Sequence, residues 1–239
     1  MTRVTRNSEA GKNLKAIASV VRPPVNLVTK RDYRGVENLA IDSGIVVSPN
    51  HISLFDPLAI AQFLWDNDRP PRFLGKASIF RIPILGKLIK NAGQIPVYRN
   101  SHAAAQSVNY SIASVKRGEA VVIYPEGTIT RDPNLWPMHG KSGAVNVALS
   151  ANVPLIPVAQ WGAQEIMAPY QKKLKIFPIK TIKIIAGKPI DLDDLRDKQL
   201  DSTILKIGTE RLMRAIADLL GELREEIPPA ELLKWGRRT

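Results

Sequence analysis

Short apolar runs alternate along the chain with longer stretches in which apolar residues recur every three or four positions. The short runs predict buried strands, and the longer spacing predicts amphipathic helices. Strands are expected at 44–48, 72–75, 94–98, 120–124, 154–159, 173–178 and 181–187. Helices are expected at 10–21, 57–66, 77–81, 84–91, 102–117, 141–150 and 202–226.

This alternation of strands and helices is typical of α/β proteins. We predict a single, largely parallel central sheet with helices on both faces, plus an N-terminal amphipathic helical segment. Pro23-Pro24 is expected to stop the first helix, and Pro228-Pro229 the last. We divide the chain into residues 1–34, a basic amphipathic segment predicted to associate with membranes, and residues 35–239, the domain that carries the chemistry.

The net charge of +12 is unevenly distributed. Residues 1–118 carry 17 Lys and Arg against 7 Asp and Glu, whereas residues 119–239 carry 17 against 15. Between Arg69 and Gly118 there are nine basic residues and no acidic one. A surface of one sign favours an anionic partner, such as lipid headgroups, nucleic acid or phosphorylated cofactors.

We predict that the protein contacts the bilayer through two basic amphipathic segments, residues 10–22 and 77–92. In a helix over the second segment, one face would gather the apolar residues and two lysines would border it. These residues are Ile84, Leu85, Leu88, Ile89, Lys87 and Lys90. Such a helix can lie in a membrane interface. The alternative is a core-packing helix with a solvated basic rim.

The composition excludes several kinds of chemistry. The chain has no cysteine, which excludes disulfides, thiolate metal sites and an acyl-cysteine intermediate. It has only three histidines, at positions 51, 102 and 139, which argues against a histidine-rich metal site. No apolar run approaches the roughly 18 residues of a membrane span, and the N-terminus lacks an apolar signal region. We therefore expect a soluble or peripheral protein that needs no metal.

The segment from Asn50 to Pro57 carries the clearest chemistry. It joins a predicted strand to a helix whose start is marked by Asp56 at the cap and Pro57 at the first position. From this loop His51 can turn back so that Asp56 accepts a hydrogen bond from one ring nitrogen, and the other nitrogen is free to take a proton. The pair would then be two thirds of a catalytic triad, with the substrate as nucleophile. The alternative is a plain cap and a loop histidine.

Three further polar positions follow predicted strands or open a helix. Arg99 directly follows the predicted strand 94–98, and its planar guanidinium matches a phosphate. Gly127 lets the backbone turn and approach a ligand, while Glu126 can orient a substrate hydroxyl or hold a basic neighbour. Lys141 stands beside helix N-terminal amides that can bind an anion. The alternatives are a surface arginine, an ordinary turn and a solvated lysine.

In order and spacing, these segments resemble the sequence blocks of the glycerolipid acyltransferase family, typified by lysophosphatidic acid acyltransferases. Asn50 to Asp56 matches Asn-His-x4-Asp, and Gly93 to Arg99 resembles the second block, which ends in Arg. Tyr124 to Thr128 matches the core Phe-Pro-Glu-Gly-Thr, and Val153 to Val158 resembles the apolar fourth block with its proline. The resemblance covers roughly residues 35–190, and it makes residues 35–239 an acyltransferase domain.

The resemblance implies roles for individual residues. His51 would be the general base and Asp56 its orienting partner. The substrate-binding residues would be Arg99, Glu126, Gly127, Thr128, Arg131 and Lys141. One departure concerns the third block, because Ile129 stands where the family has Arg. If this stretch is extended, residues 129 and 131 point the same way, and Arg131 can supply the missing charge.

The implied reaction moves a fatty acyl group from an acyl thioester to the free hydroxyl of lysophosphatidic acid, giving phosphatidic acid in phospholipid biosynthesis. Acyl-CoA is the expected donor and acyl carrier protein the alternative; no cofactor, metal or covalent enzyme intermediate is expected. The expected partners are this donor, a lysophospholipid acceptor and an anionic membrane surface. The expected location is peripheral, on the cytoplasmic face of the cell membrane.

Two other functions remain open. The first is the same chemistry on glycerol 3-phosphate, another lysophospholipid or a glycolipid. The second is a non-catalytic basic protein that binds membranes or nucleic acid. Aromatic residues make up only 6% of the chain, and the basic stretch 69–118 lacks the interleaved aromatics of a single-strand platform. We therefore expect no nucleic-acid partner.

Overall fold

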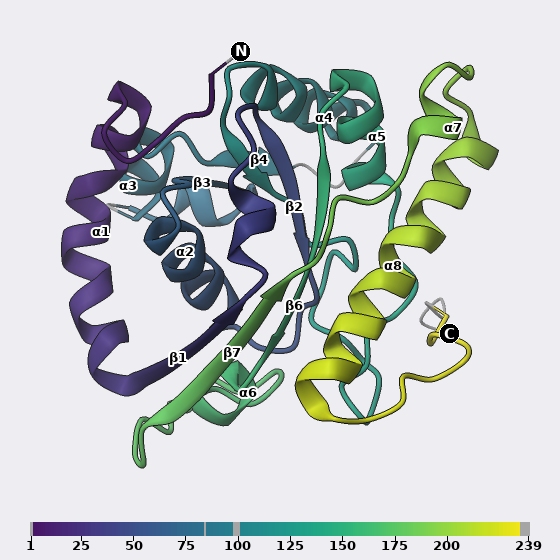
Figure 1. The fold of residues 1–239 in the computed structure, drawn as a ribbon. Coiled ribbons are helices and arrows are strands. Elements are labelled where there is room, and N and C mark those ends of the chain that lie inside the picture. The colour runs from purple at the N-terminus through teal and green to yellow at the C-terminus, as the bar shows by residue number, and fades with distance from the viewer. Residues whose placement is uncertain (1, 84, 98–100, 235–239) are drawn as a thin grey trace.

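A computed structural model describes residues 2–83, 85–97 and 101–234 (Figure 1). Within these ranges seven strands form one sheet in the order β1-β7-β6-β2-β5-β3-β4. The strands are β1 Thr29–Arg34, β2 Ile45–Pro49, β3 Pro71–Lys76, β4 Ile95–Val97, β5 Ala120–Val122, β6 Leu155–Trp161 and β7 Lys180–Ala186. Every neighbouring pair is parallel except β6 with β7. The predicted single, largely parallel sheet is confirmed.

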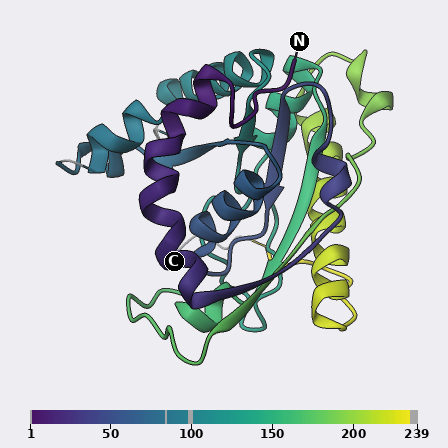
Figure 2. The same cartoon turned by 60° about the vertical axis from the view of Figure 1, so that its left-hand side comes forward.

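Helices cover both faces of this sheet, as predicted (Figures 1 and 2). The α-helices are α1 Glu9–Val28, α2 Asp56–Asp66, α3 Leu85–Asn91, α4 Ser101–Lys116, α5 Gly143–Ala151, α6 Ala163–Ile166, α7 Asp193–Arg196 and α8 Ser202–Arg224, with 3-10 turns at Val36–Leu39 and Ile79–Arg81. The faces follow from strand alternation. Val47 packs in one core cluster with Phe63 of α2, whereas Val46 packs in the other with Val145 of α5 and Leu212 of α8.

The N-terminal helix continues beyond its expected end. Pro23 and Pro24 lie inside α1, which runs to Val28. Tertiary contacts hold the helix on both sides of the prolines: before them Arg22 donates to Asp66 of α2 at 2.5 Å, and after them Val25 is buried in the core. The prediction that this proline pair ends the helix was therefore wrong, because propensity is a weak constraint where packing is strong.

Two strand assignments also differ from the sequence predictions. Residues 173–178 form an exposed loop instead of a strand. Conversely, Thr29–Arg34, which was not predicted as a strand, forms β1 at the sheet edge and pairs in parallel with β7. Its charged sequence hides the pattern, because an edge strand has one row of backbone groups and much of its side-chain surface in water. Residues 29–34 of the predicted N-terminal segment thus belong to the sheet, and the segment's membrane association stays a prediction.

The strand directions bring several chain segments to one edge of the sheet. The carboxyl ends of the parallel strands β2, β5 and β6 lie together. Because β7 runs antiparallel to β6, with Trp161 opposite Lys183, the start of β7 lies at that edge too. We call it the carboxyl edge. In the described part of the chain, no helix has both the length and the apolar character required to span a bilayer.

Candidate active site

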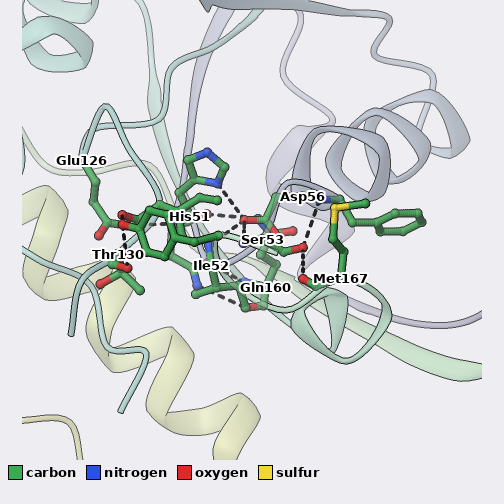
Figure 3. A network of polar contacts seen from close by, with 12 residues as sticks. His51, Ile52, Ser53, Asp56, Glu126, Thr130, Gln160 and Met167 are labelled. Carbon is green, nitrogen blue, oxygen red and sulfur yellow. Dashed lines mark hydrogen bonds and ion pairs between the residues drawn. The ribbon is translucent and has the colours of Figure 1, made fainter. Parts of the chain in front are cut away.

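His51, on the loop after β2, and Asp56, the first residue of α2, form a hydrogen-bonded pair at the carboxyl edge (Figure 3). His51 Nδ1 lies 2.8 Å from Asp56 Oδ2. The same oxygen accepts from the backbone N–H groups of Ile52 at 2.6 Å and Ser53 at 2.8 Å. With Oδ2 so placed, the Nδ1–H tautomer is the one that Asp56 favours, and Nε2 is left to take a proton. The predicted geometry of the pair is confirmed.

Burial sets the electrostatics of this pair. Asp56 is fully buried, and the side chain of His51 is 16% exposed. Burial raises the pKa of Asp56, while the contact with His51 and the amides of Ser53 and Ile52 oppose that rise. Asp56 is also the first residue of α2, where the helix dipole favours a negative charge. In this setting the carboxylate of Asp56 lies where it can stabilise a positive charge on the neighbouring ring.

The backbone of His51 is held on both sides by the segment that follows β5. Glu126 Oε1 accepts from His51 N at 2.9 Å, and Thr130 N donates to His51 O at 2.7 Å. The other oxygen of Glu126, Oε2, accepts from Met138 N at 3.0 Å. Glu126 is completely buried, and both of its oxygens bind backbone amides. In this structure it orients the His51 loop, and its predicted contact with a substrate hydroxyl stays a prediction.

Burial raises the pKa of Glu126 from 4.5 to about 8, against the opposing N–H groups of Met138 and His51. The folded protein therefore keeps a proton between these pH values that the unfolded chain has released, so this group's contribution to stability falls as pH rises through that window. We expect Glu126→Gln to remove this decrease of the unfolding free energy with pH, because glutamine does not titrate. The amide nitrogen of the glutamine will face one backbone N–H, which lowers stability equally at every pH. Chemical denaturation across the window measures the slope.

The control for this measurement is Glu165→Gln, because Glu165 is exposed. Its substitution should leave the pH dependence of the unfolding free energy as it is in the wild type. Equal slopes for wild type and Glu126→Gln would show that Glu126 titrates in the folded protein as it does in water.

Gln160 of β6 holds the start of the His51 loop, a role that was not predicted from the sequence. Asn50 Oδ1 accepts from Gln160 N at 2.8 Å, and Gln160 Nε2 donates to Asn50 O at 3.0 Å. Both residues are fully buried. On the other side, Ser53 Oγ donates to Met167 O at 2.6 Å. The signal in the sequence is an amide directly after the predicted apolar strand 154–159, at the carboxyl end where parallel strands gather functional groups.

Tyr124 packs against the imidazole. The two ring centroids are 4.4 Å apart with planes tilted by 33°. Burial, and secondly the negative charge of Asp56, raise the pKa of the Tyr124 phenol well above its usual range. Oδ1 of Asp56 has no hydrogen-bond partner among the described residues. The ring thus fixes one face of His51, and a neutral phenol lies close to the carboxylate.

The predicted substrate-binding residues lie at the same edge, except for Arg99, which falls outside the described residues. Gly127 closes the turn after β5 by donating from its N to Tyr124 O, with φ of 67°. A Cβ on Gly127 would lie 3.1 Å from Lys141 Nζ, so the lysine side chain passes over this glycine. Thr128 follows, half-buried. Contact of these residues with a substrate stays a prediction.

Ile129 and Arg131 have different surroundings. Ile129 is buried, whereas Arg131 is exposed. The position held by Arg in the resembled family is therefore an apolar interior position here. Arg131 is exposed on the same loop, two residues further on. Its predicted role at the acceptor stays a prediction.

Comparison with known proteins gives one family and several similar proteins. Residues 30–161 match the family model described as Acyltransferase. The chain is 30% identical over 182 residues to the chloroplastic 1-acyl-sn-glycerol-3-phosphate acyltransferase BAT2 of Brassica napus, covering 72% of this chain and 51% of the plant protein. It is 28% identical to the 1-acyl-sn-glycerol-3-phosphate acyltransferase of Bacillus subtilis, covering 78% of this chain and 86% of that protein.

The fold also matches a solved structure. The crystal structure of the 1-acyl-sn-glycerophosphate (LPA) acyltransferase PlsC from Thermotoga maritima superposes with a TM-score of 0.65 at 20% identity, covering 90% of this chain and 81% of that one. The chain spans about half the length of the plant relatives that it matches.

Proposed function

The chain belongs to the acyltransferase family, and from this premise we propose that it transfers a fatty acyl group from an acyl thioester to the free hydroxyl of lysophosphatidic acid. The product would be phosphatidic acid, an intermediate of phospholipid biosynthesis. The observation that carries the proposal is the pair of His51 Nδ1 and Asp56 Oδ2, 2.8 Å apart at the carboxyl edge. The names of the relatives from Brassica napus and Bacillus subtilis support lysophosphatidic acid as the acceptor.

In this proposal His51 acts as general base on the substrate itself. Nε2 takes the proton of the acceptor hydroxyl while the hydroxyl oxygen attacks the carbonyl carbon of the thioester. The C–S bond then breaks, the thiolate leaves, and the imidazolium returns the proton to the sulfur. Asp56 holds the Nδ1–H tautomer and stabilises the transient imidazolium. The bonds and protons balance without a covalent enzyme intermediate.

The rate enhancement has several sources. General base catalysis contributes about 10²- to 10⁴-fold. Positioning of the acceptor and stabilisation of the oxyanion supply the remainder. Glu126 and Thr130 hold the backbone of His51. This serves general base catalysis, because the imidazole is fixed before the substrate arrives.

The direct test uses purified protein, lysophosphatidic acid and one acyl chain presented as acyl-CoA or as acyl carrier protein thioester. We expect phosphatidic acid by mass spectrometry with at least one donor, and the ratio of the two rates identifies the donor. No product with either donor would refute the proposal.

A second candidate is the same reaction on another acceptor, namely glycerol 3-phosphate, a different lysophospholipid or a glycolipid. The observation that favours it is the buried Ile129 in place of the family's arginine. A panel of these acceptors with one donor separates the candidates, because kcat/KM ranks them directly.

The predicted anion site gives a variant test. We expect Arg99→Ala to raise the KM for lysophosphatidic acid by about 10- to 100-fold, because a charge-assisted hydrogen bond contributes about 1.5–3 kcal/mol. Arg131→Ala should act likewise if it holds the same phosphate. The KM for the acyl donor should change little in both variants, and initial-rate kinetics on each substrate measure this. If Arg131→Ala matches the wild type while Arg99→Ala is impaired, Arg131 does not bind the phosphate.

A further inference from the structure

A loop at the carboxyl edge exposes apolar and basic side chains together. This loop, residues 170–179, joins the segment after α6 to β7 and is called the docking loop below. Its large apolar side chains are exposed, and Phe177 is 76% exposed. Three lysines alternate with them in sequence and are exposed as well. The residues are Leu174, Ile176, Phe177, Ile179, Lys172, Lys173 and Lys175.

The sheet register brings the end of α1 beside this loop. Thr29 of β1 pairs with Lys180 of β7, and the two strands are parallel. Leu27, two residues before Thr29, and Ile179, the residue before Lys180, therefore approach the same edge. Leu27 is 74% exposed. Figures 1 and 2 show the green loop before β7 projecting beyond the end of α1.

The docking loop is tied to the proposed active site by hydrogen bonds. Tyr170 Oη donates to Ile129 O at 2.6 Å, in the segment that holds His51. Leu54 and Leu58, which flank Asp56 in sequence, are also exposed large apolar residues. Exposed apolar side chains of α1, α2 and the docking loop thus occur at the edge that carries His51.

Charge identifies the kind of partner. From residue 166 to residue 190 the chain has six lysines and no acidic residue. Apolar side chains interleaved with lysines match the boundary between acyl chains and anionic headgroups. A protein partner would need a shaped pocket for Phe177, whereas a bilayer accepts exposed apolar side chains without one.

We propose that the docking loop, together with Leu27, Leu54 and Leu58, is the surface that seats this protein on an anionic lipid bilayer, with the carboxyl edge turned toward the lipid. The proposal rests on the proposed function, because it places His51 where a lysophospholipid acceptor resides. The proposed surface is a different one from the segments 10–22 and 77–92 that were predicted from the sequence to meet the membrane. In the first of these, Leu14 packs against Trp65 and Ala92 of the protein itself.

The absence of cysteine permits a direct test. A Phe177→Cys variant carries one site for an environment-sensitive fluorophore. The control is Leu200→Cys, because Leu200 is partly exposed just before α8. Arg224 at the far end of α8 stacks on Trp161 at the carboxyl edge, and 23 residues of helix span about 34 Å. Leu200 therefore lies at the opposite side of the molecule.

With phosphatidylcholine–phosphatidylglycerol vesicles, we expect the probe at 177 to shift to the blue and to be quenched by lipid-borne quencher. The probe at 200 should keep its aqueous emission. Lys172→Glu and Lys173→Glu should each lower vesicle partitioning by about fivefold or more. Each of these variants should retain wild-type turnover on lysophosphatidic acid dispersed in detergent.

Three outcomes would overturn the proposal: no vesicle association, association with an aqueous probe at 177, or a blue shift that depends on protein concentration without vesicles. The last would indicate self-association of the chain. Turnover on the detergent-dispersed acceptor reports on the proposed function separately. Active protein with an aqueous probe at 177 rejects the surface alone, and inactive wild type rejects the function.

Discussion

A His51→Ala variant is expected to fold and to lose acyl transfer by about 10²- to 10⁴-fold. The imidazole is the group that takes the acceptor's proton, and alanine removes it without touching the two backbone hydrogen bonds that hold residue 51. Those bonds use its N and O atoms, to Glu126 and Thr130. The side chain is 16% exposed, so the space that alanine leaves is open in part to solvent. Initial rates with lysophosphatidic acid and an acyl thioester, beside a thermal unfolding curve, measure both expectations.

The matched control is His139→Ala. His139 is exposed, and its backbone N, which alanine keeps, donates to Leu233 O. This variant should show wild-type turnover and stability. Turnover near that of the wild type in a folded His51→Ala protein would reject His51 as the base.

Much of the fold follows from local patterns in the sequence. The apolar runs that become β2, β5 and β6 are flanked by helical periodicities, and the sheet that results is the predicted one. The His51–Asp56 pair was also predictable, because both residues lie within six positions and a helix start fixes one of them. Short-range geometry of this kind needs no knowledge of which strands become neighbours.

The supports of the pair depend on strand order, and strand order is a long-range property. Glu126 and Gln160 are 75 and 110 positions away from their partners on the His51 loop. They reach it because β2 lies between β5 and β6 in the sheet. From sequence alone the charge of Glu126 is visible and its burial is not, so its hydrogen bonds to the backbone of His51 and Met138 could not be predicted.

The missed elements have a similar cause. The sequence of β1 is polar because the strand lies at an edge, and α1 continues through two prolines because α2 holds it. Residues 173–178 have apolar residues at strand-like spacing but leave them exposed. The pattern that suggested a buried strand there is the one that the docking-loop proposal assigns to lipid.

The resembled sequence blocks become one structural unit for the same reason. The first supplies His51 and Asp56 after β2, the third supplies Glu126 after β5, and the fourth forms β6, which delivers Gln160. Each follows or forms a strand whose carboxyl end reaches the same edge. The residues between blocks are those that cross a face of the sheet from one strand to the next. The order and spacing of the blocks therefore indicate the family better than any single block does.

An Asp56→Asn variant is expected to lose activity by about 10²- to 10⁴-fold while keeping its fold. Ile52 N and Ser53 N both donate to Oδ2, so they will hold the amide oxygen of asparagine in that place. That oxygen still accepts from His51 Nδ1, and the tautomer survives. What is lost is the negative charge that stabilises the imidazolium, and turnover should fall without an equal change in KM.

An Asp56→Ala variant separates this effect from folding. It leaves three donors without their acceptor, among them two buried backbone amides, and each unsatisfied group costs about 1–3 kcal/mol. We therefore expect Asp56→Ala to unfold at a clearly lower temperature than Asp56→Asn, with activity at least as low. Asp193→Asn is the control, because Asp193 is likewise the first residue of a helix but its side chain is 89% exposed. If Asp56→Asn retains wild-type turnover, the charge of Asp56 has no part in the reaction, and the pair serves only to shape the loop.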